Sequence, residues 1–138
     1  MSGQTVYLLE DCESDALAFS RAIRKLAPGT EVVRWRQAQT AIQAMDSGLP
    51  APDLFFIDLN LPGMNGLEFL RRLRSSSAWQ FVPTVVLTSS ASPDDVRSSY
   101  REGAGGHIVK PQAFDNLVAL LGKCLTYWFE AVLRPNRA

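Results

Sequence analysis

Residues 54–66 read Leu-Phe-Phe-Ile-Asp-Leu-Asn-Leu-Pro-Gly-Met-Asn-Gly, an apolar run that ends in an aspartate and passes into a loop. The run Leu54–Ile57 is typical of a strand that is buried on both faces, and the Pro, Gly and Asn residues after it cannot continue that strand. Asp58 therefore lies where a buried strand meets its exit loop, at the edge where open α/β sheets bind ligands. Alone it is weak evidence, because many aspartates only cap turns.

Polar side chains follow three further apolar runs in the same way. Glu10 and Asp11 end one run, Thr88 ends another, and Lys110 ends a third. Amphipathic segments separate the runs, so strands and helices are expected to alternate along the chain. The expected strands are Thr5–Leu9, Glu31–Trp35, Leu54–Ile57, Val82–Leu87 and His107–Val109. The expected helices are Ser14–Leu26, Gln37–Met45, Gly66–Arg74, one that begins at Pro93 after the cap residue Ser92, and a long one from Ala113 to about Leu133.

This alternation predicts an α/β fold with a parallel sheet, right-handed crossovers and helices on both faces. The carboxyl ends of all strands in such a sheet lie along one edge. Residues that are far apart in the sequence can therefore meet there: Glu10, Asp11, Asp58, Thr88 and Lys110.

Length and composition narrow the class of protein. The 138 residues fit one domain, and 46% hydrophobic with 20% charged residues is ordinary globular composition. Fourteen basic and fourteen acidic residues cancel, which argues against binding to nucleic acid or anionic membranes through bulk charge. Neither a membrane-spanning stretch nor a signal peptide is evident, and Cys12 and Cys124 are too few for a disulfide framework or a zinc site. A cytoplasmic location is expected.

The five residues at the sheet edge predict phosphoryl chemistry. Three carboxylates in one place repel each other, and oxygen ligands without nearby His or Cys favour a hard cation, with Mg²⁺ the usual choice. Asp58 would attack phosphorus as a nucleophile, Lys110 would neutralise the phosphoryl oxygens, and Thr88 would donate a hydrogen bond to one of them.

Each residue has a simpler interpretation when it is considered alone. Glu10 and Asp11 could cap the first helix, Thr88 could lie in a solvated turn, and Lys110 could be an exposed lysine. Their occurrence together, at four strand ends, favours the phosphoryl site.

The sequence resembles the receiver domains of two-component response regulators, whose fold is a flavodoxin-like, doubly wound sheet of five parallel strands. The residues that carry the resemblance occur in family order over nearly the whole chain: Glu10-Asp11, Asp58 with Leu61-Pro62 and Asn65-Gly66, Thr88, Gly103-Ala104 and Lys110-Pro111. The resemblance implies a single receiver domain over residues 1–138, with an extended last helix over about residues 114–135.

The resemblance assigns a role to each site residue. Asp58 would be the phosphoacceptor, and Lys110 would pair with the phosphoryl group. Mg²⁺ would be bound by Asp58, by Asp11 directly, by Glu10 through water, and by the backbone carbonyl of Asn60. A histidine of a sensor kinase would donate the phosphoryl group, and the output would be another protein, either a downstream partner or a phosphorelay carrier.

Neighbouring residues are expected to serve docking. The region around Cys12, Asp15 and Ala18, with the loop after Lys110, resembles the kinase-docking surface of the family. Asp15 is explained nearly as well as an ordinary charge in the first turn of a helix. The peptide bond between Lys110 and Pro111 is expected to be cis, as it is in the family.

Three further residues bear on hydrolysis and switching. Side chains at Asn60 and Ser90 would tune the approach of the water that hydrolyses the acyl phosphate. His107 stands where many receivers carry Tyr or Phe, the ring that turns inward when the threonine reaches toward phosphate. An imidazole fits that space and can titrate near neutrality, although a half-exposed strand histidine is the simpler interpretation.

The last helix predicts a surface for a second copy. Its expected core stripe consists of Phe114, Leu117, Leu121, Cys124, Trp128 and Val132. A second apolar set, with nothing in the chain expected to cover it, consists of Val118, Leu125, Phe129 and Leu133. The ending, residues 127–135, resembles the tail of single-domain regulators paired with bacterial phytochromes, which dimerise through the fourth and fifth helices and the strand between them. A homodimer is therefore expected, with a tail that folds back on a monomer as the alternative.

Three other functions fit the sequence less well than the signalling role. A Mg²⁺-dependent phosphatase with an aspartyl nucleophile typically has a second acid two residues later, where this chain has Asn60. A pseudo-receiver that binds its partner without phosphate would lack one of the acids, the threonine or the lysine. A flavin carrier of the same fold needs a phosphate-binding loop after the first strand, and the acidic residues 12–15 would repel that phosphate.

Overall fold

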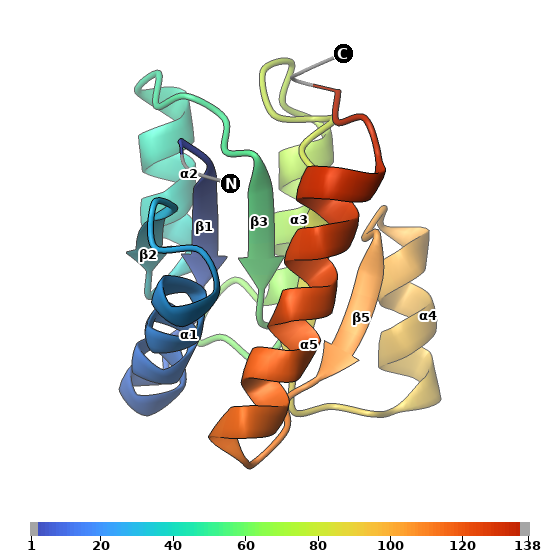
Figure 1. Ribbon diagram of the computed structural model, residues 1–138. Helices are drawn as coiled ribbons and strands as arrows, with labels where there is room; N and C mark the ends of the chain where they lie inside the picture. The colour runs from blue at the N-terminus through green and yellow to red at the C-terminus, as the bar shows by residue number, and fades with distance from the viewer. Residues whose placement is uncertain (1–2, 136–138) are drawn as a thin grey trace.

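The computed structural model describes residues 3–135, which form one five-stranded parallel sheet covered by helices on both faces (Figure 1). The strand order β2-β1-β3-β4-β5 confirms the flavodoxin-like doubly wound fold. The strands are β1 (Thr5–Leu9), β2 (Glu31–Trp35), β3 (Leu54–Ile57), β4 (Thr84–Thr88) and β5 (Gly106–Val109). The helices are α1 (Glu13–Leu26), α2 (Ala38–Asp46), α3 (Gly66–Arg74), α4 (Pro93–Arg101) and α5 (Phe114–Thr126), followed by the π-helix η1 (Tyr127–Ala131).

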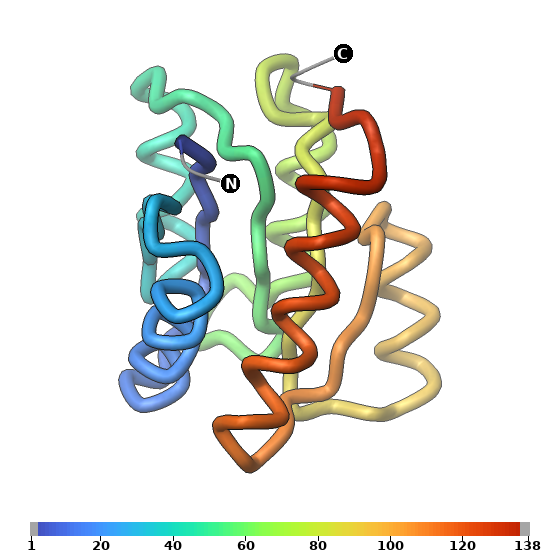
Figure 2. Tube along the Cα trace, viewed as in Figure 1, coloured from blue at the N-terminus to red at the C-terminus, as the bar shows by residue number. Residues whose placement is uncertain are grey.

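Two hydrophobic cores lie on opposite faces of the sheet, because successive strand residues point to opposite sides. The core beneath α2 and α3 includes Tyr7, Leu9, Phe55 and Ile57. The core beneath α1 and α5 includes Val6, Leu8, Leu54 and Phe56. All four residues of β3 are fully buried, as the unbroken apolar run predicts. Helix α4 packs against the edge strand β5, and the chain trace shows the two segments side by side (Figure 2).

The end of the last helix differs from the sequence prediction of a helix to about Leu133. Helix α5 stops at Thr126, continues as the wider turn η1, and leaves helical geometry at Val132, whose backbone is extended. The chain can then fold back along the amino-terminal end of the sheet.

A buried ion pair anchors the folded-back tail. The guanidinium of Arg134 lies 2.8 Å from the Asp53 carboxylate, hydrogen-bonds the side chain of Gln4 at 3.0 Å, and covers the ring of Phe129 at 4.9 Å. Arg134 and Asp53 are both buried, and Asp53 also accepts a hydrogen bond from the amide of Thr5.

The two apolar faces predicted for the last helix are also partly wrong. Leu125, predicted to be uncovered, is fully buried against α1 and the sheet, and Phe129 is half-buried beneath Arg134. Phe114, predicted to lie in the core, is 39% exposed because it begins α5 where that helix extends past the end of β5 (Figure 1). Leu133 is 85% exposed, as predicted.

Within residues 3–135 the structure has no helix of the length and hydrophobicity required to cross a bilayer.

Candidate functional site

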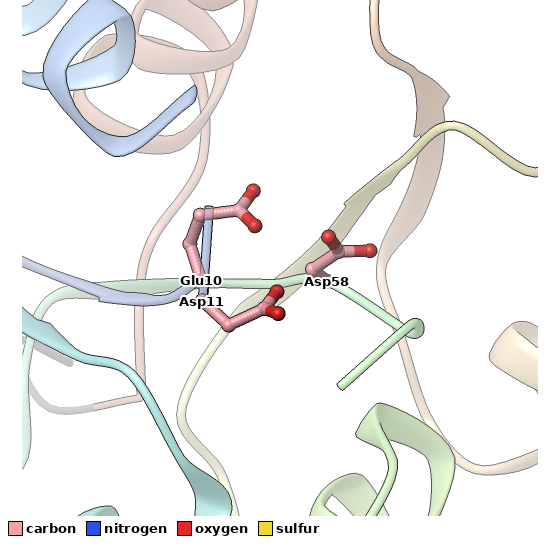
Figure 3. Close-up of side chains that lie close together, drawn as sticks. All are labelled: Glu10, Asp11 and Asp58. Atoms are coloured by element: carbon pink, nitrogen blue, oxygen red, sulfur yellow. The ribbon is translucent and has the colours of Figure 1, made fainter. Parts of the chain in front are cut away.

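Three carboxylates meet at the carboxyl ends of the two central strands. Leu9 and Ile57 pair across β1 and β3, so the residues that follow them lie side by side. One carboxylate oxygen from each of Glu10, Asp11 and Asp58 lies within 4.8 Å of the others, and all three side chains project into a common space (Figure 3). Glu10 and Asp58 are buried and Asp11 is exposed, so the cluster opens to solvent at one side.

Lys110 supplies the positive charge of the site from the end of β5. Its Nζ lies 2.6 Å from Glu10 Oε1 and 2.9 Å from Asp58 Oδ2. The backbone holds it there, because the Lys110 amide donates a hydrogen bond of 2.8 Å to the carbonyl of Thr88 on the adjacent strand β4. The lysine side chain is only 16% exposed, so its attraction to the acids is weakly screened by water.

Thr88 ends β4 as a fully buried residue whose hydroxyl faces the site. Its Oγ1 accepts a hydrogen bond from Asn60 Nδ2 at 3.4 Å, while the Asn60 amide donates to Asp58 Oδ1 at 3.2 Å. The Thr88 hydroxyl also acts to lower the pKa of the Asp58 carboxyl. The predicted hydroxyl is therefore beside the predicted nucleophile.

Glu10 and Asp58 are both buried, but their pKa values shift in opposite directions. Burial raises the pKa of Glu10 to about 7, against the opposing effect of Lys110. Burial also acts to raise the pKa of Asp58, but the hydrogen bonds from Lys110 and Asn60 outweigh it and hold that pKa below its ordinary value. For Lys110, burial is outweighed by its carboxylate partners, which raise the pKa of the ammonium. Asp58 is thus an ionised carboxylate, and Lys110 a cation, at neutral pH.

The donor set fits a divalent cation. Glu10, Asp11 and Asp58 offer only oxygen atoms, and the single ammonium of Lys110 balances only part of the negative charge that they carry when ionised. A hard ion with a preference for carboxylate oxygen would offset the remaining repulsion. The backbone carbonyl of Asn60, the fourth predicted ligand, belongs to the same loop two residues after Asp58.

The loop after Asp58 is held close to the site by a glycine and a helix cap. The Gly66 amide donates to the carbonyl of Leu59 at 3.1 Å, and a Cβ at Gly66 would lie 2.2 Å from the carbonyl oxygen of Asp58. Asn65 and Glu68 form a reciprocal capping box that starts α3. Glycine is thus required here for a close approach between helix and loop.

The structure gives Asp15 a contact that sequence reasoning missed. Its Oδ2 lies 2.8 Å from Lys110 Nζ, so the lysine has a third carboxylate partner, from the first turn of α1. No strand-end pattern signals this contact, because Asp15 belongs to a helix. The peptide bond between Lys110 and Pro111 is trans, so the predicted cis bond is wrong. The trans isomer is the intrinsically favoured one, and it leaves the ammonium within reach of the acids.

His107 is hydrogen-bonded at both ring nitrogens. Nε2 lies 2.9 Å from the carbonyl oxygen of Ser90, and Nδ1 lies 3.0 Å from the hydroxyl of the buried Ser99 on α4. The imidazole therefore joins β5 to the β4–α4 loop, two residues beyond Thr88. The Ser90 hydroxyl itself hydrogen-bonds the carboxylate of Asp95.

A small cavity lies beside the site on the surface predicted to dock a kinase. It has a volume of about 120 Å³ and is lined by Asp15, Ala18, Lys110 and Phe114 among others. Cys12, at the cap position of α1, is exposed.

Comparisons with known proteins agree with the fold. Residues 6–122 match the family described as Response regulator receiver domain. The response regulator Rcp1 of Synechocystis sp. is 26% identical over 137 residues, which cover 96% of this chain and 93% of that protein. The probable methanogenesis regulatory protein FilR2 of Methanothrix harundinacea is 28% identical over 127 residues, covering 89% of this chain and 82% of that protein.

Two solved structures cover nearly the full length of both chains. The Mn²⁺-bound form of Rcp1 superimposes with a TM-score of 0.85 at 26% identity, covering 96% of this chain and 99% of that one. The phosphorylated cyanobacterial phytochrome response regulator RcpA superimposes with a TM-score of 0.89 at 26% identity, covering 96% of this chain and 98% of that one.

Proposed function

The chain belongs to the response regulator receiver domain family, and from that premise we propose that it accepts a phosphoryl group on Asp58 from a sensor histidine kinase. One observation carries the proposal: a buried, ionised Asp58 carboxylate lies 2.9 Å from a lysine ammonium and within 4.8 Å of two further acids at a solvent-open edge. That arrangement holds an oxygen nucleophile beside the charges needed to stabilise a phosphoryl group.

The chain's own side chains account for most of the transfer. An Asp58 oxygen forms a bond to phosphorus as the bond between phosphorus and the kinase histidine nitrogen breaks, and the electron pair leaves with the imidazole. Lys110 neutralises negative charge on the phosphoryl oxygens, and the hydroxyl of Thr88 donates to one of them. Mg²⁺, held by Glu10, Asp11, Asp58 and the carbonyl of Asn60, would supply further neutralisation of that charge.

The protein is accordingly a phosphoacceptor that catalyses its own phosphorylation and dephosphorylation, and has no separate substrate. Hydrolysis restores the Asp58 carboxylate. The side chain of Asn60 hydrogen-bonds Thr88 and that of Ser90 hydrogen-bonds Asp95. We propose that both side chains tune the approach of the attacking water. When Thr88 reaches toward the phosphoryl group, its loop moves against His107, which links that loop to α4 and β5.

Similarity at full length points to the class of kinase. Rcp1 and RcpA match this chain over more than nine-tenths of both proteins, and RcpA is described as a phytochrome response regulator. A bacteriophytochrome histidine kinase is therefore the partner that we propose to test first. The exchange would take place in the cytoplasm, and the signal would leave through protein–protein contacts or a phosphorelay.

We also propose a homodimer, formed by the α4-β5-α5 face. Tyr100 of α4, Val109 of β5 and Phe114 of α5 are 52%, 43% and 39% exposed, so each of the three elements presents an apolar side chain to solvent. Replacing Val109 and Phe114 with Asp should then convert a dimer to a monomer in light scattering. Replacing Leu133, which is exposed on the tail, should leave the mass unchanged.

A phosphatase is the rival that shares this chemistry. Asn60 argues against it, because the position two residues after the nucleophile carries an amide that cannot act as a general acid. The amide is also engaged with Thr88, at 3.4 Å.

Beryllofluoride with Mg²⁺ tests the proposal directly, since it mimics a phosphoryl group bound to a carboxylate. Wild-type protein should bind it, and Asp58→Asn should not, as measured by ¹⁹F NMR. Asp46→Asn, at an exposed acid that ends α2, is the control and should still bind. Equal binding by wild type and Asp58→Asn would refute the assignment. Failure of wild-type protein to bind would favour a phosphate-independent pseudo-receiver.

A further inference from the structure

The ammonium of Lys110 is shared among three carboxylates. Its Nζ lies 2.6 Å from Glu10, 2.8 Å from Asp15 and 2.9 Å from Asp58. Lys110 Nζ donates hydrogen bonds to Asp15 and Asp58, and its contact with Glu10 is an ion pair. An ammonium carries three N–H donors and no acceptor, so a new acceptor for Lys110 competes with these partners.

The three carboxylates differ in their other contacts. Glu10 and Asp58 belong to the cluster at the ends of β1 and β3, together with Asp11. Asp15 lies outside that cluster, in the first turn of α1, and its side chain is 45% exposed. Of the three partners of Lys110, Asp15 is thus the one that is neither the nucleophile nor a member of the candidate metal cluster.

The contact between Asp15 and Lys110 is not explained by the general preference for acidic residues in the first turn of a helix. Asp15 and Lys110 are 95 residues apart in sequence, and the lysine is largely buried. Glu13, another acid in the same turn, instead pairs with Arg34 and Arg36 at the surface. The two acids of one helical turn therefore have distinct partners, and only Asp15 contacts the phosphoryl site.

We propose that Asp15 is a positioning residue that competes with the phosphoryl group for the ammonium of Lys110. The inference rests on the proposed function and adds a residue to it. A phosphoryl group on Asp58 brings three acceptor oxygens, which compete with Asp15 for the donors of Lys110. Asp15 holds the ammonium toward α1 in the unphosphorylated protein, and so weakens the binding of a phosphoryl group.

The resting contact can be measured without Mg²⁺ or a phosphoryl analogue. Two hydrogen bonds and an ion pair with carboxylates should slow proton exchange at the Lys110 ammonium and make its ¹⁵Nζ signal visible by NMR, with Lys110→Ala identifying the signal. Asp15→Asn should shift and broaden that signal, Asp15→Glu should restore it in part, and Glu13→Gln should leave it unchanged. A Lys110 signal that Asp15→Asn does not alter would overturn the proposal.

Titration with beryllofluoride and Mg²⁺ tests the competition itself. Asp15→Asn should bind roughly two- to tenfold more tightly than wild type, a modest gain because the ion pair is partly exposed. The control Glu13→Gln removes the same charge from the same helical turn and should bind as wild type does.

A double-mutant cycle separates positioning from the general field of a nearby charge. In the Lys110→Ala background, Asp15→Asn should give no further change in affinity if Asp15 acts through the lysine. The same gain with and without Lys110, or no gain at all, would overturn the role of Asp15 while leaving the phosphoryl site intact. A wild-type protein that binds no beryllofluoride would instead refute the proposed function, and this inference with it.

Discussion

Replacing Gly66 with alanine should destabilise the protein through a clash with the backbone that carries Asp58. The new Cβ would lie 2.2 Å from the carbonyl oxygen of Asp58 and 2.8 Å from the Cα of Leu59. Ordinary contacts begin at about 3.4 Å, so the start of α3 and the loop must separate by about 1 Å. Overpacking of this kind costs about 1–3 kcal/mol, and the better helix propensity of alanine returns less than about 1 kcal/mol. A net loss of about 2 kcal/mol is expected.

Urea unfolding followed by tryptophan fluorescence measures this loss. Gly106→Ala is the matched control, because its Cβ would meet only Val85 Cγ1, at 3.9 Å, and should leave the free energy of unfolding unchanged or slightly raised. Gly66→Ala should also bind beryllofluoride more weakly, since displacement of the loop moves Asp58 relative to Lys110. Equal unfolding free energies for Gly66→Ala and wild type would refute this reasoning.

Two further predictions concern the tail and the cysteines. Arg134→Met removes one partner of the buried ion pair with Asp53 and should lower the free energy of unfolding in urea by about 3 kcal/mol. Arg97→Met removes one partner of an exposed pair and should change that free energy little. Equal effects of the two substitutions would contradict the importance of burial. Burial raises the pKa of Cys124 to about 11, so only about one thiol in a thousand is ionised at pH 8. Alkylation of Cys124 should therefore be slow at pH 8 and should become faster as the pH rises. Mass spectrometry should find the exposed Cys12 alkylated first, and equal rates at pH 8 would contradict the prediction.

The sheet and most of the site could be predicted because their signals are local. Apolar runs such as Leu54–Ile57 mark buried strands, and the parallel architecture then brings the residues after them to one edge. Glu10, Asp58 and Lys110 follow strands, and their meeting is a consequence of topology that requires no knowledge of side-chain packing.

The features that escaped prediction depend on contacts between distant side chains. Asp15 meets Lys110 from a helix, so a rule about strand ends does not include it. Arg134 and Asp53 pair because the tail folds back after a π-turn, a change of path that the apolar spacing of the last helix does not reveal. For the pair of Arg134 and Asp53, the sequence does contain one indication, because an aspartate directly before a fully buried strand requires a partner.

The contacts of His107 attach the Thr88 loop to two other elements. Nε2 donates to the carbonyl of Ser90 in that loop, and Nδ1 hydrogen-bonds the hydroxyl of Ser99 on α4. The Ser99 hydroxyl also donates to the carbonyl of Asp95, 2.8 Å away in the same helix. A displacement of the loop would therefore be transmitted through one imidazole ring to both β5 and α4.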